Sequence, residues 1–200
     1  MNGIPHPFSI FNVARLTMRM QLPLFCNNTS MNQSLTELNA EALYQKLLTQ
    51  IRDALANTPK VAVVGIRSGG AWIAERVVDD LKLDNPPGFI DVSFYRDDYA
   101  QKGLPAEVKP TQIPFDVVDS TILLIDDVLY TGRTTRAAIN ELFDYGRPAR
   151  ILLAALVDRG ERELPIAADF VAAHVSLEKN EKLVLQRLND NTFSLTVENA

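Results

Sequence analysis

The chain has 200 residues and a formal net charge of -5, with 46% hydrophobic and 22% charged residues. This length and composition predict one globular domain, and the acidic balance excludes a chain that coats nucleic acid through bulk positive charge. A single cysteine, Cys26, excludes an internal disulfide, and two scattered histidines form no zinc motif, so we expect a cytoplasmic protein.

The first 36 residues contain no acidic side chain, and Arg15 and Arg19 lie among apolar residues as in some targeting segments. The apolar runs are broken by these arginines and by Pro23, and none approaches the roughly 18 to 20 residues of a membrane span. We therefore expect residues 1–30 to be a disordered or artefactual leader, residues 31–200 to form the folded domain, and the protein to have no membrane association.

Helix and strand patterns alternate from Met31 onward. Ser34 and Glu37 have the spacing of a capping box. They precede a predicted helix to about residue 56, in which Leu43, Leu47, Ile51 and Leu55 share one face. A short run rich in β-branched residues then predicts a buried strand from Lys60, and the glycines after it open a second helix that runs to Leu81.

The middle of the chain continues the alternation. Residues 89–98 predict a partly alternating strand, and 99–112 have no periodicity, which is typical of a mobile loop. A buried strand over 121–125 leads through Asp126 and Asp127 into a loop of small residues. The helix that follows, from about Arg133 to Tyr145, ends before Gly146 and Pro148 and carries three apolar residues on one face, namely Ile139, Leu142 and Phe143.

Four more strands are predicted, over 150–158, 169–173, 182–186 and 193–197. Strands alternating with helices favour an α/β fold, a mainly parallel sheet flanked by helices, in which ligands bind at the carboxyl ends of the strands. Three polar segments follow such strand ends, namely 67–70, 126–135 and 158–165. We expect them to meet at one edge of the sheet.

The segment 126–135 has the chemistry of a sugar-phosphate site. A turn of small residues that opens a helix presents unpaired amides and the positive end of the helix dipole to an anion. Gly132 allows close approach of the backbone, and three hydroxyls add donors, on Thr131, Thr134 and Thr135. The carboxylates of Asp126 and Asp127 would repel a phosphate, but they suit ribose hydroxyls or a magnesium ion.

Other phosphate motifs fit less well. No strand is followed by a G-x-G-x-x-G pattern, and the glycines between Gly65 and Gly70 lead into Ala71 and Trp72 where a P-loop needs Lys and Ser or Thr. A strand that ends in two aspartates is by itself often only a solvated strand end. The attached loop and helix favour the ligand site here.

The segment ILLIDDVLYTGRT resembles the phosphoribosyl-pyrophosphate signature of type I phosphoribosyltransferases. Together with DVSFYRDD, GRPARILLAALVDRGERELPIAADFV and EKLVLQ, it resembles the PyrR family of bifunctional pyrimidine operon regulators and uracil phosphoribosyltransferases. The resemblance covers roughly residues 34 to 198. It implies the type I phosphoribosyltransferase fold with a flexible loop and a small hood, and conversion of uracil and phosphoribosyl pyrophosphate (PRPP) to UMP and pyrophosphate.

The resemblance also implies roles for individual residues. Asp126 and Asp127 would hold the ribose 2- and 3-hydroxyls, and the segment from Tyr130 to Thr134 would bind the 5-phosphate. The remaining implied residues are Arg67, Ser68 and Gly69 for pyrophosphate, Arg96 in the catalytic loop 95–112, and Asp158, Arg159 and Leu183 for uracil; the substrate-binding residues between 128 and 134 are Val128, Leu129, Tyr130, Thr131, Gly132, Arg133 and Thr134. Mg²⁺ is the implied cofactor, bound to pyrophosphate oxygens, with no metal ligand assigned to the chain.

The family resemblance further implies a homodimer or higher homo-oligomer and RNA as a possible partner. The predicted first helix offers only Lys46 and Arg52 against three acidic residues, and Glu161 stands where some relatives carry histidine, so the attraction for a phosphate backbone is reduced. The alternative to a catalyst is a UMP-sensing RNA-binding attenuation regulator with little catalysis. A purine or orotate transferase is a further alternative, because the ribose-phosphate segment does not select the base.

Overall fold

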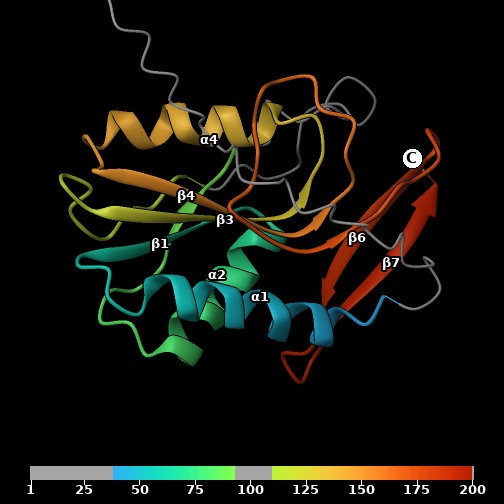
Figure 1. The fold of residues 1–200 in the computed structure, drawn as a ribbon, viewed down its shortest axis with the longest axis horizontal. Helices are drawn as coiled ribbons and strands as arrows, with labels where there is room; N and C mark the ends of the chain where they lie inside the picture. Colours follow the sequence, from blue (N-terminus) through green and yellow to red (C-terminus); the bar gives the residue numbers. More distant parts are fainter. Residues whose placement is uncertain (1–37, 93–109, 200) are drawn as a thin grey trace, which may run out of the picture. The chain divides into compact units, whose positions relative to one another are not determined.

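The computed structural model describes residues 38–92 and 110–199, which lie within one compact unit, Met31–Ala200. Its centre is a five-stranded parallel sheet with the strand order β2-β1-β3-β4-β5 (Figure 1). The strands are β1 (Val61–Ile66), β2 (Gly88–Ile90), β3 (Thr121–Leu129), β4 (Arg150–Asp158) and β5 (Phe170–His174). This architecture confirms the predicted α/β fold. The predicted leader, 1–30, lies outside the described residues.

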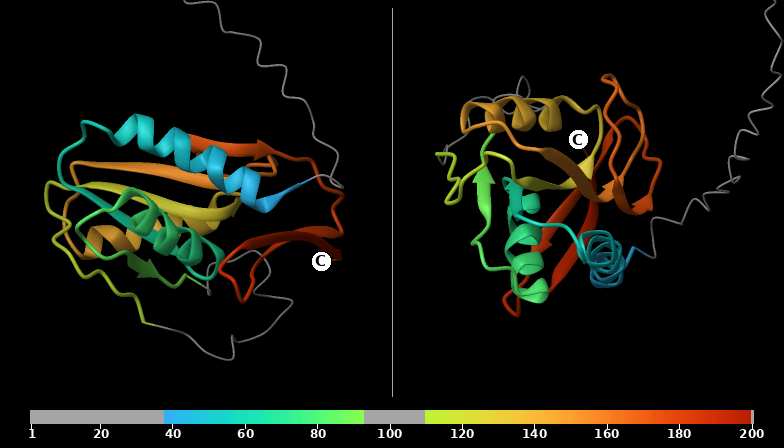
Figure 2. Two further views of the ribbon diagram at one scale, coloured as in Figure 1. Left: turned by 90° about the horizontal axis from the view of Figure 1, so that it is seen from below. Right: turned by 60° about the vertical axis from the view of Figure 1, so that its left-hand side comes forward.

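Three helices of the described residues cover the two faces of the sheet. Helices α1 (Ala40–Leu55) and α2 (Gly69–Leu81) pack on one face, and α4 (Arg133–Asp144) packs on the other (Figures 1 and 2). Successive residues of a strand point to opposite faces, so Leu123 and Ile125 of β3 join the core under α1 and α2, whereas Ile122 and Leu124 join the core under α4. Burial on both faces explains why these strands read as continuous apolar runs.

Helix α1 begins later than the capping pattern predicted. Its N-cap is Asn39, whose Oδ1 accepts a hydrogen bond from the amide of Ala42 at 3.1 Å. The predicted capping box of Ser34 and Glu37 lies outside the described residues. The predicted apolar face is confirmed, because Leu43, Leu47, Ile51 and Leu55 are all buried.

Strand β3 is longer than predicted. It runs through Leu129, because Val128 and Leu129 continue the ladder with Val157 and Asp158 of β4. Asp126 and Asp127 therefore lie inside the strand, where the sheet fixes their height. Without an apolar side chain to mark them, the sequence pattern ended the strand at Ile125.

The buried face of α4 also differs from the prediction. Leu142 is fully buried and Ile139 packs against the core, but 51% of the surface of Phe143 is exposed. Residues facing the sheet repeat at spacings of three and four, through Thr135, Ala138 and Leu142. The position after Leu142 is turned about 100° away from that stripe, and the prediction for Phe143 was wrong.

The predicted strand over 89–98 is only partly described. β2 ends at Ile90, and residues 93–98 lie outside the described ranges, as does most of the predicted loop 99–112. The end of that loop is tied to β2, because the amides and carbonyls of Phe89 and Gln112 exchange hydrogen bonds of 2.7 and 2.8 Å. These hydrogen bonds therefore fix the last residue of the predicted loop, Gln112, beside β2.

The last two strands form a separate antiparallel hairpin, β6 (Glu181–Arg187) and β7 (Phe193–Asn199), close to the predicted bounds. The hairpin lies beside the end of the sheet where the parallel strands finish (Figures 1 and 2). Its position corresponds to the small hood that the family resemblance implies. Helices of the described ranges are all too short or too polar to span a membrane.

A polar cluster holds the hairpin to both helices of that face. The guanidinium of Arg76 on α2 makes two bonds, of 2.7 and 2.8 Å, to the carboxylate of Glu41 on α1, which also accepts the amide of Phe193 on β7 at 2.6 Å. Arg76 lies over the ring of Tyr44, whose hydroxyl donates to Asp80 at 2.6 Å. Burial and the bond to Asp80 raise the pKa of the Tyr44 phenol, so the hydroxyl remains a donor at any ordinary pH.

The Glu41 carboxylate predicts a pH-dependent stability. The hydrogen bond from Arg76 lowers the pKa of Glu41 below its usual 4.5, so its contribution to stability is full above that value and is lost as the pH falls through the folded-state pKa. Glu41→Gln should lower the free energy of unfolding by about 1 to 3 kcal/mol at pH 7, and the gap to wild type should close in acid. Urea denaturation at pH 7 and below pH 4 measures it. Glu178→Gln, an exposed control, should change little at either pH, and a gap for Glu41→Gln that widens in acid would contradict the assignment.

Candidate active site

The strand order reverses between β1 and β3. The chain passes from β1 to β2 on one side and later returns to place β3 on the other side of β1. Loops at such a reversal diverge and leave a crevice at the carboxyl ends of the strands, where ligands of open α/β sheets bind. The loop Arg67–Ser68 after β1 and the loop Tyr130–Gly132 after β3 both leave from this point, as the sequence predicted, although Gly69 and Gly70 already belong to the first turn of α2.

The loop after β1 is held through its main chain. The amide of Arg67 donates to the carbonyl of Ile90 at 2.9 Å, and its guanidinium lies 5.0 Å from the centre of the Phe89 ring. The Arg67–Ser68 peptide bond is cis, and the exposed Ser68 is the N-cap residue of α2 without a side-chain capping bond. The Nε of Arg67 is buried and has no hydrogen-bond partner among the described residues. This nitrogen is a donor left over beside the reversal.

Two glycines in the first turn of α2 let the helix start directly on β3. A Cβ added at Gly69 would lie 2.4 Å from Oδ2 of Asp127, and one added at Gly70 would lie 2.3 Å from the carbonyl oxygen of Ile125. Real Cβ atoms do not approach so closely, so the absence of side chains here sets the separation of the two loops. The predicted pyrophosphate loop and the predicted ribose carboxylates are thereby brought into contact.

The carboxylates of Asp126 and Asp127 face different surroundings. Asp126 is 6% exposed, and its Oδ1 accepts the amide of Asp127 at 3.0 Å. Asp127 is half-buried, against Gly69. One carboxylate is thus fixed by its own backbone, and the next borders the loop that follows β1.

The loop after β3 turns into α4 through a left-handed glycine. Gly132 has φ of 92°, which favours glycine, and its carbonyl accepts the first helical bond, from Arg136 at 2.9 Å. The amides of residues 133–135 therefore precede the helical ladder, and that of Arg133 donates to Oγ1 of Thr131 at 3.3 Å. The exposed Arg133 side chain forms an ion pair with Glu163. Thr134 and Thr135 keep amides at the positive end of the helix.

Thr135 differs from the predicted role of a hydroxyl donor to a phosphate. Its side chain is fully buried, and its Oγ1 has no hydrogen-bond partner in the described part of the chain. Thr135→Val removes an unpaired polar group without changing the shape, so we expect the free energy of unfolding to rise by about 1 kcal/mol.

Urea denaturation measures that rise. Thr49→Val is the matched control, because the exposed Thr49 hydroxyl donates to the carbonyl of Gln45 at 2.9 Å. Thr49→Val should leave stability nearly unchanged or slightly lower. A loss of stability in Thr135→Val would show that the hydroxyl has a partner.

The predicted base-side residues gather around the end of β4. Arg159 is 9% exposed; its guanidinium lies 3.9 Å from the centre of the Tyr130 ring, and its Nη1 donates to the carbonyl of Glu181 at 3.2 Å. Leu183, also 9% exposed, belongs to the same core cluster as Val157. Arg159 thus joins the loop after β3 to the hairpin that carries Leu183.

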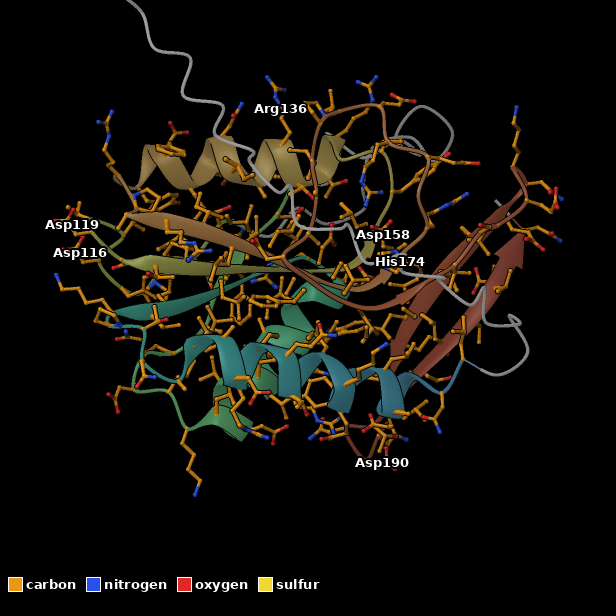
Figure 3. The ribbon with its side chains drawn as sticks, viewed as in Figure 1. Asp116, Asp119, Arg136, Asp158, His174 and Asp190 are labelled. Carbon is orange, nitrogen blue, oxygen red and sulfur yellow. The ribbon has the colours of Figure 1, made fainter. Side chains whose placement is uncertain are left out.

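Asp158 lies beside them but is already paired. Its carboxylate accepts the amide of Gly160 at 2.8 Å and Nη2 of Arg162 at 2.5 Å, and the imidazole of His174 lies 3.8 Å away (Figure 3). Sequence reasoning missed Arg162, whose side chain makes more hydrogen bonds at the end of β4 than the side chain of Asp158 or Arg159 does. Only its position in the polar segment after β4 pointed to it.

The other predicted residues take different positions. Leu129 is buried in the core under α4, and Val128 packs on the opposite core, so their side chains support the strand. Arg96 lies outside the described residues. Within 38–92 and 110–199, no three His, Cys, Asp or Glu side chains could hold a metal ion. Magnesium often binds through one or two carboxylates, substrate phosphates and water, and Asp126 and Asp127 fit that form of site.

The arrangement defines a class of protein: an α/β fold with a loop of small residues that opens a helix, and two adjacent carboxylates, at the reversal of the sheet. The family profile described as phosphoribosyl transferase domain matches residues 31–182. The proteins named Bifunctional protein PyrR from Ralstonia nicotianae and Nitrosococcus oceani are 56% and 47% identical over 76% and 79% of this chain, and 87% and 92% of their own lengths. The chain belongs to the phosphoribosyltransferase family and, within it, to the PyrR family.

Solved structures agree on the fold. A hypoxanthine-guanine phosphoribosyltransferase from Bacillus anthracis superposes with a TM-score of 0.56 at 17% identity, over 71% of this chain and 82% of its own. The hypoxanthine phosphoribosyltransferase of Trypanosoma cruzi gives 0.52 at 18% identity, over 70% and 81%. At this identity the likeness concerns the fold and not the base.

Proposed function

We propose that the protein transfers the 5-phosphoribosyl group of PRPP to uracil and releases UMP and pyrophosphate, in the cytoplasm. One observation carries the proposal: Asp126 and Asp127 lie at the sheet reversal between a helix N-terminus and the segment Arg67–Gly70. Carboxylates accept the ribose hydroxyls, and the amides at the start of α4 bind the 5-phosphate. The ligand would therefore be a sugar bearing phosphate groups at both ends.

The reaction needs charge stabilisation and positioning. Breaking the bond between the anomeric carbon and pyrophosphate leaves positive charge on the sugar and negative charge on the leaving group. The buried Nε of Arg67, without a partner among the described residues, and the backbone of the adjacent loop are donors on the leaving-group side. A bound magnesium ion, for which Asp126 and Asp127 would be the nearest candidate ligands, would supply charge neutralisation for the departing pyrophosphate.

The base would approach from the side of β4. Arg159 lies between the loop after β3 and the hairpin, and the hairpin carries Leu183, so a flat ring would have one polar and one apolar neighbour. Uracil nitrogen forms the new bond to the anomeric carbon and gives up its proton, and positioning of the ring is the main requirement. The loop 95–112 with Arg96, mostly outside the described residues, would exclude water that would otherwise hydrolyse the sugar phosphate.

A base panel tests the proposal. The purified protein is mixed with magnesium, PRPP and uracil, orotate, hypoxanthine or guanine in separate reactions, and pyrophosphate release is recorded. We expect release with uracil, formation of UMP, and no turnover after chelation of magnesium. Absence of turnover with uracil, or faster turnover with a purine or orotate, would overturn the proposal.

A second candidate function is UMP-dependent RNA binding, which would regulate pyrimidine genes. The word bifunctional in the names of the relatives favours it. The hollow along β5 supports RNA binding less well, because its lining includes three carboxylates, those of Asp53, Asp158 and Asp169, beside Arg162. Carboxylates repel a phosphate backbone. Titration of a labelled leader RNA with and without UMP, at fixed salt, tests this function. Tight binding enhanced by UMP would support a regulator, and binding no stronger than to an unrelated RNA would exclude it.

A further inference from the structure

We propose that Arg162 is a positioning residue that fixes the base-side loop, residues 159–166 after β4, to the phosphate loop, Tyr130–Gly132 after β3. Arg162 would thereby hold the sites for the base and for the 5-phosphate of a nucleotide at a fixed distance from each other. The inference rests on the proposed function and concerns the same site. Arg162 lies in neither strand nor helix, four residues beyond the end of β4. Its side chain is 22% exposed, so its bonds are partly sheltered from water.

The guanidinium of Arg162 spans both loops. Nη1 donates to the carbonyl of Tyr130 at 2.5 Å and to that of Gly160 at 3.0 Å, while Nε donates to the carbonyl of Ile166 at 3.0 Å. Nη2 donates to the carboxylate of Asp158 at 2.5 Å. A planar fork with donors on three nitrogens can hold three such directions at once, which a lysine cannot do.

The two loops also touch at the residues that follow Arg162. The amides of Glu163 and Leu164 donate to the carbonyl of Thr131 at 3.0 and 3.1 Å. A Cβ added at Gly132 would lie 3.1 Å from the side chain of Ile166. Residues 163–166 therefore lie against the loop after β3, and the Arg162 side chain also bonds Gly160 and Ile166, on either side of it, while it bonds Tyr130.

Tyr130 is where the two kinds of contact meet. Its carbonyl accepts from Arg162, and its ring lies under the guanidinium of Arg159, a predicted base-side residue. A shift of Tyr130 would therefore move the phosphate loop and Arg159 relative to each other. Such a shift affects a ligand that spans both loops more than it affects a ligand that occupies only one.

The test compares UMP, which would span both loops, with ribose 5-phosphate and uracil, each of which would occupy only one. Calorimetry measures the affinity of wild type and Arg162→Met for UMP, ribose 5-phosphate and uracil, and steady-state kinetics gives kcat and the KM for PRPP. We expect UMP affinity and kcat to fall about tenfold or more, with ribose 5-phosphate affinity and the KM for PRPP changed less than about threefold. Arg162→Lys should recover part of the loss.

Arg150→Met is the matched control, because the exposed Arg150 begins β4, at the opposite end of that strand from these loops. It should behave as wild type. Unchanged UMP affinity in Arg162→Met, or an equal loss for UMP and ribose 5-phosphate, would overturn the proposal. If Arg162→Met fails to fold, Arg162→Lys is judged by the ratio of its UMP affinity to its ribose 5-phosphate affinity. A ratio equal to that of wild type overturns the proposal. Failure of the proposed function would be recognised separately, because the wild-type protein would then not turn over uracil. In that case the binding measurements use the nucleotide of the base that the protein does accept, in place of UMP.

Discussion

Replacing either carboxylate of β3 by its amide should cost about 2 to 3 kcal/mol of transition-state stabilisation, a fall of roughly 30- to 150-fold in kcat/KM for PRPP. Asn keeps the shape and one oxygen, so Asp126→Asn still accepts the amide of Asp127 through Oδ1. The amide nitrogen, however, presents hydrogens to ribose hydroxyls that need acceptors.

The comparison of UMP with its 2-deoxy analogue makes this prediction specific to the ribose. Wild type should bind UMP more tightly than the deoxy form, and Asp126→Asn or Asp127→Asn should narrow the difference. Calorimetry with both nucleotides gives the ratio. Asp116→Asn, an exposed carboxylate at the opposite end of β3, is the control (Figure 3). A full preference for UMP in both site variants would show that the carboxylates do not hold the sugar.

The second large effect concerns the contact of α2 with β3. In Gly70→Ala the added Cβ would lie 2.3 Å from the carbonyl oxygen of Ile125 and 3.1 Å from the Cα of Asp126, so the backbone itself must move. We expect the free energy of unfolding to fall by about 2 to 3 kcal/mol and the PRPP reaction to slow with it, because Asp126 shifts away from the loop after β1.

Gly88→Ala is the matched variant for this contact. The atom nearest to its added Cβ would be Cδ1 of Ile113 at 3.0 Å, the end of a flexible side chain, so we expect stability to change by less than about 1 kcal/mol. Urea denaturation of both proteins measures the difference. A Gly70→Ala protein as stable as Gly88→Ala would contradict the close approach of the two backbones.

Local patterns predicted the sheet and the order of the site because burial and turns leave local signals. Strands covered on both faces read as apolar runs, as in 122–125, and the left-handed turn at Gly132 is marked by glycine itself. The sequence pattern missed the length of β3 because the carboxyl-terminal part of the strand contains Asp126 and Asp127. An aspartate inside a strand gives no strand signal, and only pairing with β4 shows it.

Contacts between distant segments gave no sequence signal. Arg162 acts through the carbonyls of Tyr130 and Ile166, and backbone acceptors look the same at every position of a sequence. Arg76 meets Glu41 from another helix and lies over the ring of Phe193 from the hairpin, so its role depends on how α1, α2 and β7 assemble. The base-side part of the site was the least predictable for the same reason.

A crystal structure of the protein with UMP tests the proposed site most directly. We expect the 5-phosphate at the amides of Thr134 and Thr135, the ribose hydroxyls on Asp126 and Asp127, and the uracil ring beside Arg159. A nucleotide bound in the hollow along β5, or one whose ribose faces away from the two carboxylates, would contradict it.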